Sequence, residues 1–296
     1  MFWEYFPIPR FTFPRLLVAA GLLAGLFAIL APRLRAAEGA EAAPPTATQQ
    51  AREDYSEFLR AENHRAFAVG PGGSWGMATD ASSLKLAEAK ALDQCQAADS
   101  QNCLVYAADG KVVLDQAAWL ASWRPSSAVA AARARSGTEV GDRFPDFVVT
   151  GPDGARRSLA DFHGQVVVLH FWGSWCGICQ RELPELSRLY QRAASIPGLR
   201  FVPVQAREPI AASQRWAAAH GIHLPLYDGG GTDAFRLANG RQVSDRSLAH
   251  NYPSTYVLDQ NGVVVFRHIG ELQSWGDYLP LLAHLAATGE SRTASR

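Results

Sequence analysis

The stretch from Phe171 to Cys179, Phe-Trp-Gly-Ser-Trp-Cys-Gly-Ile-Cys, places two cysteines where a strand passes into a helix. The apolar run 166–169 before it predicts a buried strand, and the apolar residues after it are spaced for one face of a helix. Unpaired N–H groups and the dipole at a helix N-terminus favour negative charge, and therefore a thiolate. Because the thiolate is the form that attacks a disulfide, we expect Cys176 to be a nucleophile and Cys179 to resolve the mixed disulfide.

A CxxC pair can also be half of a zinc site. The sequence contains no second CxxC and no HxxxH, so the spacing favours redox chemistry over metal binding. His223, His250 and His268 lack metal-ligand spacing and are interpreted as surface or core residues. We expect neither a metal nor a cofactor.

The composition leaves room for one or two packed cores, because the chain has 296 residues and is 48 % hydrophobic. The formal net charge is zero and no basic stripe or Gly-rich phosphate loop is present, so nucleic-acid binding is not expected. The four cysteines form two close pairs, Cys95 with Cys103 and Cys176 with Cys179. Paired cysteines outside a zinc pattern indicate an oxidising compartment.

An uncharged apolar stretch, 16–31, lies near the N-terminus between flanking arginines. It is long for the core of a signal peptide and slightly short for a spanning helix, which needs about 20 residues. We favour an uncleaved membrane anchor within residues 1–35. A cleaved signal is the alternative, because Ala40-Glu41-Ala42 resembles a small-x-small cleavage site. Residues 36–53, which contain a Pro-Pro pair, are interpreted as a linker.

Residues 54–123, the middle module, predict a small α+β unit with strands at 64–69, 74–78, 103–107 and 111–114 and a helix from Ser82 to about Ala97. A Cys95–Cys103 disulfide would join this helix to the third strand as a structural staple. The competing interpretation is a second redox pair that exchanges with Cys176. The staple is favoured because neither cysteine begins a helix. The stretch resembles a small exported bacterial module of uncharacterised role, on its Ala-Phe-Ala-Val, Trp-Gly and paired-cysteine features.

Residues 124–137, rich in Ala, Ser and Arg, are interpreted as a second linker. The C-terminal domain, 138–290, alternates strands with helices and ends in a hairpin around Asn261-Gly262 and a closing helix at 275–287. This order predicts an α/β fold, a mixed sheet with helices on both faces.

The C-terminal domain resembles the thioredoxin-like thiol–disulfide oxidoreductases, in particular the membrane-tethered exported branch with TlpA- and ResA-type proteins. The match is carried by four segments: Gly141…Pro145-Asp146-Phe147, Phe171…Cys179, Glu182-Leu183-Pro184 and Tyr252…Asp259. The resemblance covers about half of the chain and implies the thioredoxin fold, preceded here by the middle module and an N-terminal apolar helix.

The resemblance also implies roles for residues beside the cysteines. Pro253 matches a cis-proline opposite the active site, Tyr252 would offer its backbone to an incoming substrate strand, and Trp175 would line the same surface. Glu182 matches a carboxylate that takes the proton of Cys179, although a solvated first-turn glutamate explains it equally well.

Two positions depart from the family pattern. Ile178 stands where the family commonly has Pro. His170 stands where thioredoxin has a buried acid. A satisfied core residue is the favoured interpretation, and a modulator of the thiolate is the alternative.

The function implied is an exported enzyme that reduces protein disulfides, of the type that acts on cytochrome c or copper-site cysteines. It would be recharged by a membrane electron donor, anchored in a bacterial inner membrane and face the periplasm, or be soluble there after signal cleavage. The alternatives are a disulfide-donating oxidase, a peroxiredoxin-like peroxidase and a non-catalytic partner-binding protein. The peroxidase is disfavoured because no Pro-x-x-x-Thr-x-x-Cys precedes Cys176.

Overall fold

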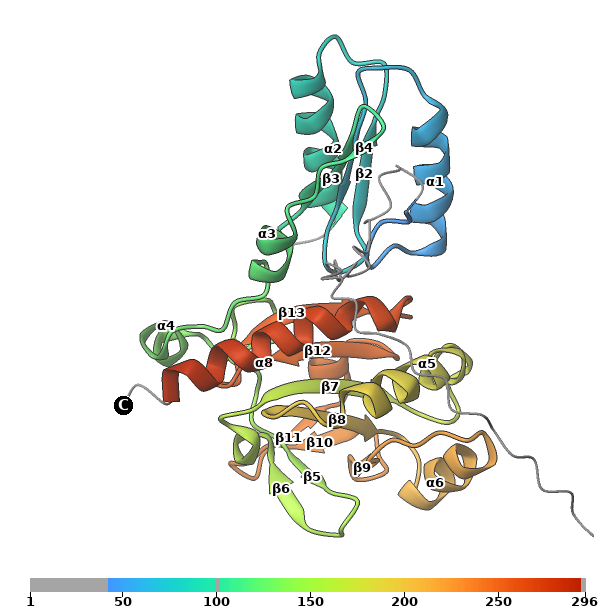
Figure 1. Cartoon of the computed structure of the whole chain (residues 1–296). Helices are drawn as coiled ribbons and strands as arrows, with labels where there is room; N and C mark the ends of the chain where they lie inside the picture. The colour runs from blue at the N-terminus through green and yellow to red at the C-terminus, as the bar shows by residue number, and fades with distance from the viewer. Residues whose placement is uncertain (1–41, 99–101, 294–296) are drawn as a thin grey trace, which may run out of the picture. The chain divides into compact units, whose positions relative to one another are not determined.

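A computed structural model describes residues 42–98 and 102–293 (Figure 1). The apolar stretch expected to anchor the chain lies outside these residues. Within them, no helix combines the length and the apolar character that crossing a membrane requires.

The first helix, α1 (Gln49–Arg60), begins inside the stretch predicted to be linker, so that prediction was wrong from residue 49 onward. Thr48 caps the helix, since its side chain accepts a 3.1 Å hydrogen bond from the Ala51 N–H group. Tyr55 and Phe58 on one face are buried and pack with Phe67 in an aromatic cluster. A capped amphipathic helix therefore follows directly after the Pro-Pro pair.

A four-stranded antiparallel sheet follows, in the order β2-β1-β3-β4. Its strands are β1 (Ala66–Val69), β2 (Trp75–Ala78), β3 (Leu104–Ala108) and β4 (Lys111–Val112), and helix α2 (Leu84–Ala98) packs against them (Figure 1). Cys95 and Cys103 form a disulfide between α2 and the residue before β3, with their Cα atoms 6.1 Å apart. Both cysteines are buried, so the bond joins helix to sheet inside this small core.

Two short helices connect this unit to the next, α3 (Gln116–Ala121) and α4 (Ala128–Arg133). Helix α4 lies within the predicted second linker, where the Ser127 side chain caps it by accepting from the Ala130 N–H group.

The second sheet has seven strands in the order β13-β12-β7-β8-β9-β5-β6. The strands are β5 (Val148–Thr150), β6 (Arg156–Ser158), β7 (Val166–Trp172), β8 (Leu199–Gln205), β9 (Tyr227–Asp228), β12 (Ser254–Leu258) and β13 (Val264–Ile269). β7, β8 and β9 run parallel, whereas β12 pairs antiparallel with both β7 and β13. The predicted mixed sheet and terminal hairpin are therefore present, and every residue of the central strand β7 is buried.

The remaining elements of this unit are the 3₁₀ turns η1 (Leu159–Phe162) and η2 (Trp275–Tyr278), the helices α5 (Gly177–Ala193), α6 (Ile210–Ala219), α7 (Arg246–Ala249) and α8 (Leu279–Thr293), and the hairpin β10 (Ala234–Arg236) and β11 (Gln242–Ser244). The closing helix predicted at 275–287 is thus a 3₁₀ turn that passes into α8.

Different elements pack on the two faces of this sheet. On β7, His170 contacts Trp275 of η2, and α5 and α8 lie side by side over that face (Figure 1). Phe171, the next residue, points to the opposite face because side chains alternate along a strand. There it packs in an aromatic cluster with Tyr256, whose hydroxyl donates to the Leu248 carbonyl of α7. Helix α5 therefore shares its face of the sheet with the C-terminal helix α8.

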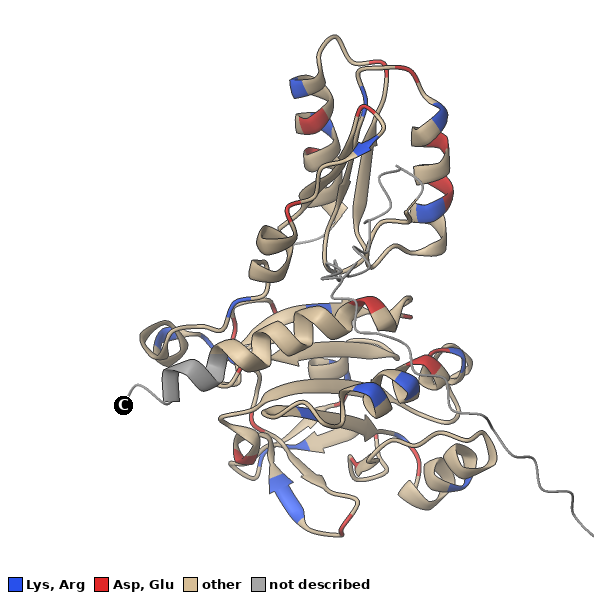
Figure 2. Ribbon diagram, viewed as in Figure 1, with Lys and Arg blue, Asp and Glu red and all other residues tan. Residues whose placement is uncertain are grey.

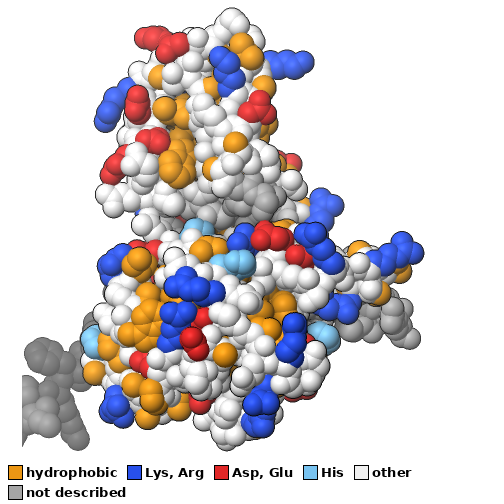
Figure 3. Space-filling model, turned by 180° about the vertical axis from the view of Figure 1, so that it is seen from behind, with side chains coloured by type: hydrophobic (Ala, Val, Ile, Leu, Met, Phe, Trp, Pro, Cys, Tyr) orange, Lys and Arg blue, Asp and Glu red, His pale blue; other side chains and the backbone are white. Residues whose placement is uncertain are grey.

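Charged residues of both signs are mixed over the surface. Acidic and basic positions follow one another along α1 (Figure 2). The face seen from behind carries basic, acidic and apolar side chains side by side (Figure 3). That face offers no continuous field of one sign.

Candidate active site

Cys176 lies at the N-cap of α5, where β7 ends and the helix begins. It is 8 % exposed, whereas Cys179 is fully buried, and the two form a disulfide with Cα atoms 5.2 Å apart. The backbone N–H of Cys179 donates to Cys176 Sγ at 3.2 Å. The same N–H and the helix dipole would stabilise a thiolate at Cys176, so the accessible sulfur is also the one that the helix activates.

The chain before β12 lies opposite this sulfur. The Tyr252–Pro253 peptide bond is cis, and Cys176 Sγ lies 3.7 Å from the Tyr252 carbonyl oxygen. Tyr252 and Pro253, two residues expected from the sequence to line the surface at the dithiol, therefore lie on the chain beside Cys176. Trp175, the third residue expected to line this surface, is 46 % exposed, and its ring packs edge-on against Tyr252 at 5.2 Å between centroids.

Glu182 lies on α5 three residues after Cys179 and is only 3 % exposed, so it is not a solvated helix residue. Its Oε1 accepts hydrogen bonds from Trp275 Nε1 at 3.0 Å and from the Leu272 N–H at 3.3 Å. Oε2 is buried without a partner. Burial raises the pKa of Glu182 well above its ordinary value, although the two N–H donors act in the other direction.

His170 lies on β7 below α5 and is buried. Its Nδ1 is 3.0 Å from Thr255 Oγ1, while Nε2 has no hydrogen-bond partner. Burial lowers the pKa of His170 to about 3, so the ring is neutral at physiological pH. The histidine is therefore only half satisfied, unlike the satisfied core residue that was the favoured interpretation.

A loop after β8 holds the chain that precedes Cys176. Glu208 accepts hydrogen bonds from the Ser174 N–H at 2.6 Å, from Ser174 Oγ at 2.5 Å and from Ser213 Oγ at 2.6 Å. The Ser174 carbonyl in turn accepts from Gln180 Nε2 at 2.5 Å. One carboxylate thus fixes the loop that positions the nucleophile.

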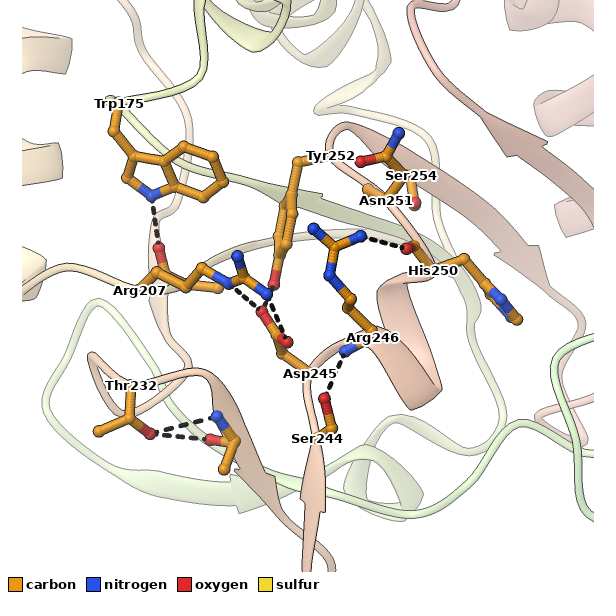
Figure 4. A network of polar contacts seen from close by, with 12 residues as sticks. Trp175, Arg207, Thr232, Ser244, Asp245, Arg246, His250, Asn251, Tyr252 and Ser254 are labelled. Carbon is orange, nitrogen blue, oxygen red and sulfur yellow. Dashed lines mark hydrogen bonds and ion pairs between the residues drawn. The ribbon is translucent and has the colours of Figure 1, made fainter.

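A second polar network lies beside Trp175 and Tyr252 (Figure 4). Arg207 donates to both oxygens of Asp245, from Nε at 2.6 Å and from Nη2 at 2.9 Å. The Tyr252 hydroxyl donates to Asp245 Oδ2 at 2.6 Å. Burial alone would raise the pKa of Asp245, but the hydrogen bonds from Arg207 and Tyr252 hold it below its ordinary value. Asp245 is therefore an ionised carboxylate that joins the β8 loop to the loop before Pro253.

Arg207, Glu208 and Asp245 were not predicted from the sequence. Each is an ordinary charged loop residue in the sequence, and Arg207 meets Asp245 only because two loops 38 residues apart converge. The positive φ of Arg207 (63°) marks an unusual turn that the sequence does not signal.

Other histidines and aromatic residues have structural contacts. Trp75 Nε1 donates to Asp54 at 2.7 Å, and His64 pairs with Asp109 at 3.3 Å. His250 lies 2.7 Å from Thr138 Oγ1. No group of three or more metal-ligating side chains occurs within residues 42–98 and 102–293.

Comparison with known proteins assigns the C-terminal part of the chain. The Redoxin family model matches residues 139–277. The thiol-disulfide oxidoreductase ResA of Geobacillus kaustophilus is 30 % identical over 130 residues, which cover 44 % of this chain and 69 % of that protein. The chain belongs to the ResA family of thiol-disulfide oxidoreductases. ResA of Bacillus anthracis is 28 % identical over 133 residues, 45 % of this chain and 71 % of its own.

Solved structures similar to this ResA family member include StoA from Bacillus subtilis, with a TM-score of 0.34 and 21 % identity over 45 % of this chain and 98 % of that one. A thiol:disulfide interchange protein DsbE from Chlorobium tepidum, described as putative in its structure report, has a TM-score of 0.39 and 22 % identity over 50 % of this chain and 99 % of that one. The thioredoxin-like α/β fold and the enzyme class expected from the sequence are confirmed by the family match.

Proposed function

We propose that this enzyme reduces disulfide bonds of proteins through Cys176 and Cys179. The Cys176 thiolate attacks one sulfur of the target, the target S–S bond breaks, and one target thiolate leaves. Cys179 then attacks Cys176 Sγ, the mixed disulfide breaks, and the second target thiolate leaves. Two electrons pass from the dithiol to the target. The observation that carries this proposal is the 3.2 Å contact from the Cys179 N–H to the partly exposed Cys176 Sγ.

Glu182 is proposed as the group that takes the proton from Cys179 during the second step. Both side chains are buried on α5, one helical turn apart, and Glu182 Oε2 is free of other partners. A carboxylate in this position needs a pKa raised toward neutrality to accept and release the proton, and its burial acts in that direction.

The loop that contains Tyr252 and Pro253 is proposed to pair with the extended backbone of the target. The Tyr252 carbonyl lies beside Cys176 Sγ, so a target strand there would have its sulfur in line with the nucleophile. Trp175, half exposed on the same surface, would contact the residues next to the target disulfide.

The site of action is proposed to be outside the cytoplasm, with the N-terminal apolar stretch as anchor or export signal and a membrane protein as electron donor. The two disulfides of the structure support a location in an oxidising compartment. Cysteines of apocytochrome c or of a copper site are the targets that the family resemblance implies. The cysteine pair of the middle module is proposed to be a structural staple.

The test is to trap the mixed disulfide. With Cys179→Ser, Cys176 remains and cannot be resolved, so a covalent complex with a disulfide-bonded test protein should accumulate and disappear on adding dithiothreitol. Cys176→Ser is the matched control and should trap nothing. Trapping by Cys176→Ser, or turnover that survives in it, would contradict the proposal, because another thiol would then be the nucleophile.

A further inference from the structure

The Arg207 guanidinium of the Arg207–Asp245 ion pair has N–H groups without a hydrogen-bond partner in the described part of the chain, and it lies beside Trp175, the residue before Cys176. The Arg207 guanidinium uses Nε and Nη2 for Asp245, and Nη1 has no hydrogen-bond partner among the described residues. The side chain of Arg207 is 31 % exposed, whereas that of Asp245 is fully buried. Donors therefore face the solvent while the neutralising carboxylate lies beneath them.

Two aromatic rings fix the position of this guanidinium. The Arg207 Cζ atom lies 5.9 Å from the centre of the Trp175 ring and 5.5 Å from that of Tyr252 (Figure 4). Trp175 is itself held by a 2.9 Å hydrogen bond from Nε1 to the Ala206 carbonyl. Because these contacts already immobilise the side chain, a ligand that binds it loses little conformational entropy.

These rings also connect the guanidinium to the reacting sulfur. Trp175 precedes Cys176 in the chain, and the Tyr252 carbonyl lies 3.7 Å from Cys176 Sγ. A target strand that crosses Cys176 along the Tyr252 backbone would lie next to Tyr252, whose ring contacts the Arg207 guanidinium. A residue next to the target cysteine is then the one within its reach.

The exposed charges at this edge favour an anion. Arg246 is exposed close to the Tyr252 ring and donates from Nη1 to the His250 carbonyl at 3.3 Å (Figure 4). Asp233 is the exposed carboxylate that acts on Arg207. The two arginines are balanced by Asp245 and Asp233, but Asp245 is buried, so two of the three charged side chains open to solvent here are cations. A guanidinium with free N–H groups is suited to a carboxylate.

We propose that Arg207, between Trp175 and Tyr252, is a specificity residue that binds an Asp or Glu side chain next to the disulfide-bonded cysteine of the target protein. This inference rests on the proposed function, because it assumes that the target disulfide is attacked at Cys176. It adds the class of sequence that the enzyme prefers.

The experiment compares three short peptides that differ only in Glu, Gln or Lys next to their single cysteine, each as a mixed disulfide with 2-mercaptoethanol. Second-order rates of reduction are measured with the pre-reduced full chain, and bis(2-hydroxyethyl) disulfide is the uncharged reference. The wild type should prefer Glu over Gln by about fivefold at low salt, the ratio that a partly exposed ion pair provides. The preference should fall toward unity at high salt.

Two variants test whether Arg207 causes the preference for the Glu peptide. Arg207→Gln combined with Asp245→Asn removes both charges and leaves no buried carboxylate unpaired, and its Glu-to-Gln ratio should be near one. Arg207→Lys is the second variant, because it keeps a charge for Asp245 and removes the free Nη1, and it should lose the preference as well. Arg188→Gln, an exposed arginine of α5 about 13 Å along the helix axis from Cys179, is the charge-matched control and should keep the full ratio.

Three results are decisive against the inference. Equal wild-type rates for Glu and Gln peptides would overturn it while reduction of the reference disulfide left the proposed function intact. A Glu preference that persists in the double variant would remove Arg207 as its cause. Failure of the wild type to reduce the reference disulfide would overturn the proposed function together with this inference.

Discussion

Trp275 Nε1 donates a 3.0 Å hydrogen bond to Oε1 of Glu182, so the indole of the C-terminal segment holds a carboxyl group against the active-site helix. The same indole packs edge-on against His170 at 6.1 Å between ring centroids. Two buried titratable groups, Glu182 and His170, each with one polar atom that has no hydrogen-bond partner, therefore both contact Trp275.

Replacement of Glu182 by Gln should slow the step in which Cys179 resolves the mixed disulfide, by at least about tenfold, because the isosteric amide cannot accept a proton. Attack by Cys176 should change little. The lifetime of the mixed disulfide is measured by quenched-flow sampling with acid, followed by mass spectrometry. Glu185→Gln, on the next turn of α5, is the control, and an unaltered lifetime in Glu182→Gln would remove Glu182 from the proton transfer.

Acid should destabilise the fold through His170. Its pKa is lowered to about 3 by burial, against about 6.5 in the unfolded chain. Below about pH 6.5 the His170 ring is protonated in the unfolded chain, whereas in the folded protein it stays neutral down to about pH 3. The free energy of unfolding therefore falls by up to about 1.4 kcal/mol per pH unit within this range.

His170→Asn keeps a hydrogen-bonding partner for Thr255 and removes this titration. Its free energy of unfolding, measured by urea denaturation between pH 4 and 7, should depend less steeply on pH than that of the wild type. Identical slopes for the two proteins would show that His170 is protonated in the folded state.

Loss of the Glu208 carboxylate should loosen the loop before Cys176. Glu208→Ala leaves the Ser174 N–H and hydroxyl and the buried Ser213 hydroxyl without their acceptor, at a cost of about 2–3 kcal/mol. Denaturation with urea measures this loss. Glu57→Ala, an exposed glutamate of α1, should stay within about 0.5 kcal/mol of the wild type. A similarly small effect at position 208 would contradict the positioning role.

Removal of the middle-module disulfide should weaken that module without touching the chemistry. Cys95→Ala with Cys103→Ala opens a short loop and should cost about 2.5 kcal/mol by the loop-entropy relation. Hydrogen exchange of the backbone amides in β1 and β3 reads the local loss. Reduction of bis(2-hydroxyethyl) disulfide should proceed at the wild-type rate, and a clear drop would instead favour electron exchange between this pair and Cys176.

Local patterns made the core of the site predictable. The apolar run before Trp172 and the helical spacing after Cys179 place both cysteines from neighbouring residues alone, and the Asn261-Gly262 turn locates the terminal hairpin in the same way. The family motif supplied Pro253 and Glu182, but the sequence left open whether Glu182 is buried. That depends on Trp275 and Leu272, which are 93 and 90 residues away.

Elements without a local signal were missed. β9 has two residues, and β10 and β11 have three each, too few for an alternating pattern to show. The start of α1 at Gln49 was hidden by the Ala- and Pro-rich stretch before it, although Thr48 is a good cap. Arg207 and Asp245 belong to loops whose convergence is set by the sheet.

The most direct test of the central claim is the reduction potential of the Cys176–Cys179 pair. The full chain would be equilibrated in dithiol buffers of defined potential, alkylated, and analysed by mass spectrometry, which reads the two cysteine pairs separately. A reductant should give a value near about −270 mV or below, where the dithiol donates electrons readily. A value near about −120 mV would mark a disulfide donor and contradict the direction of electron flow proposed here.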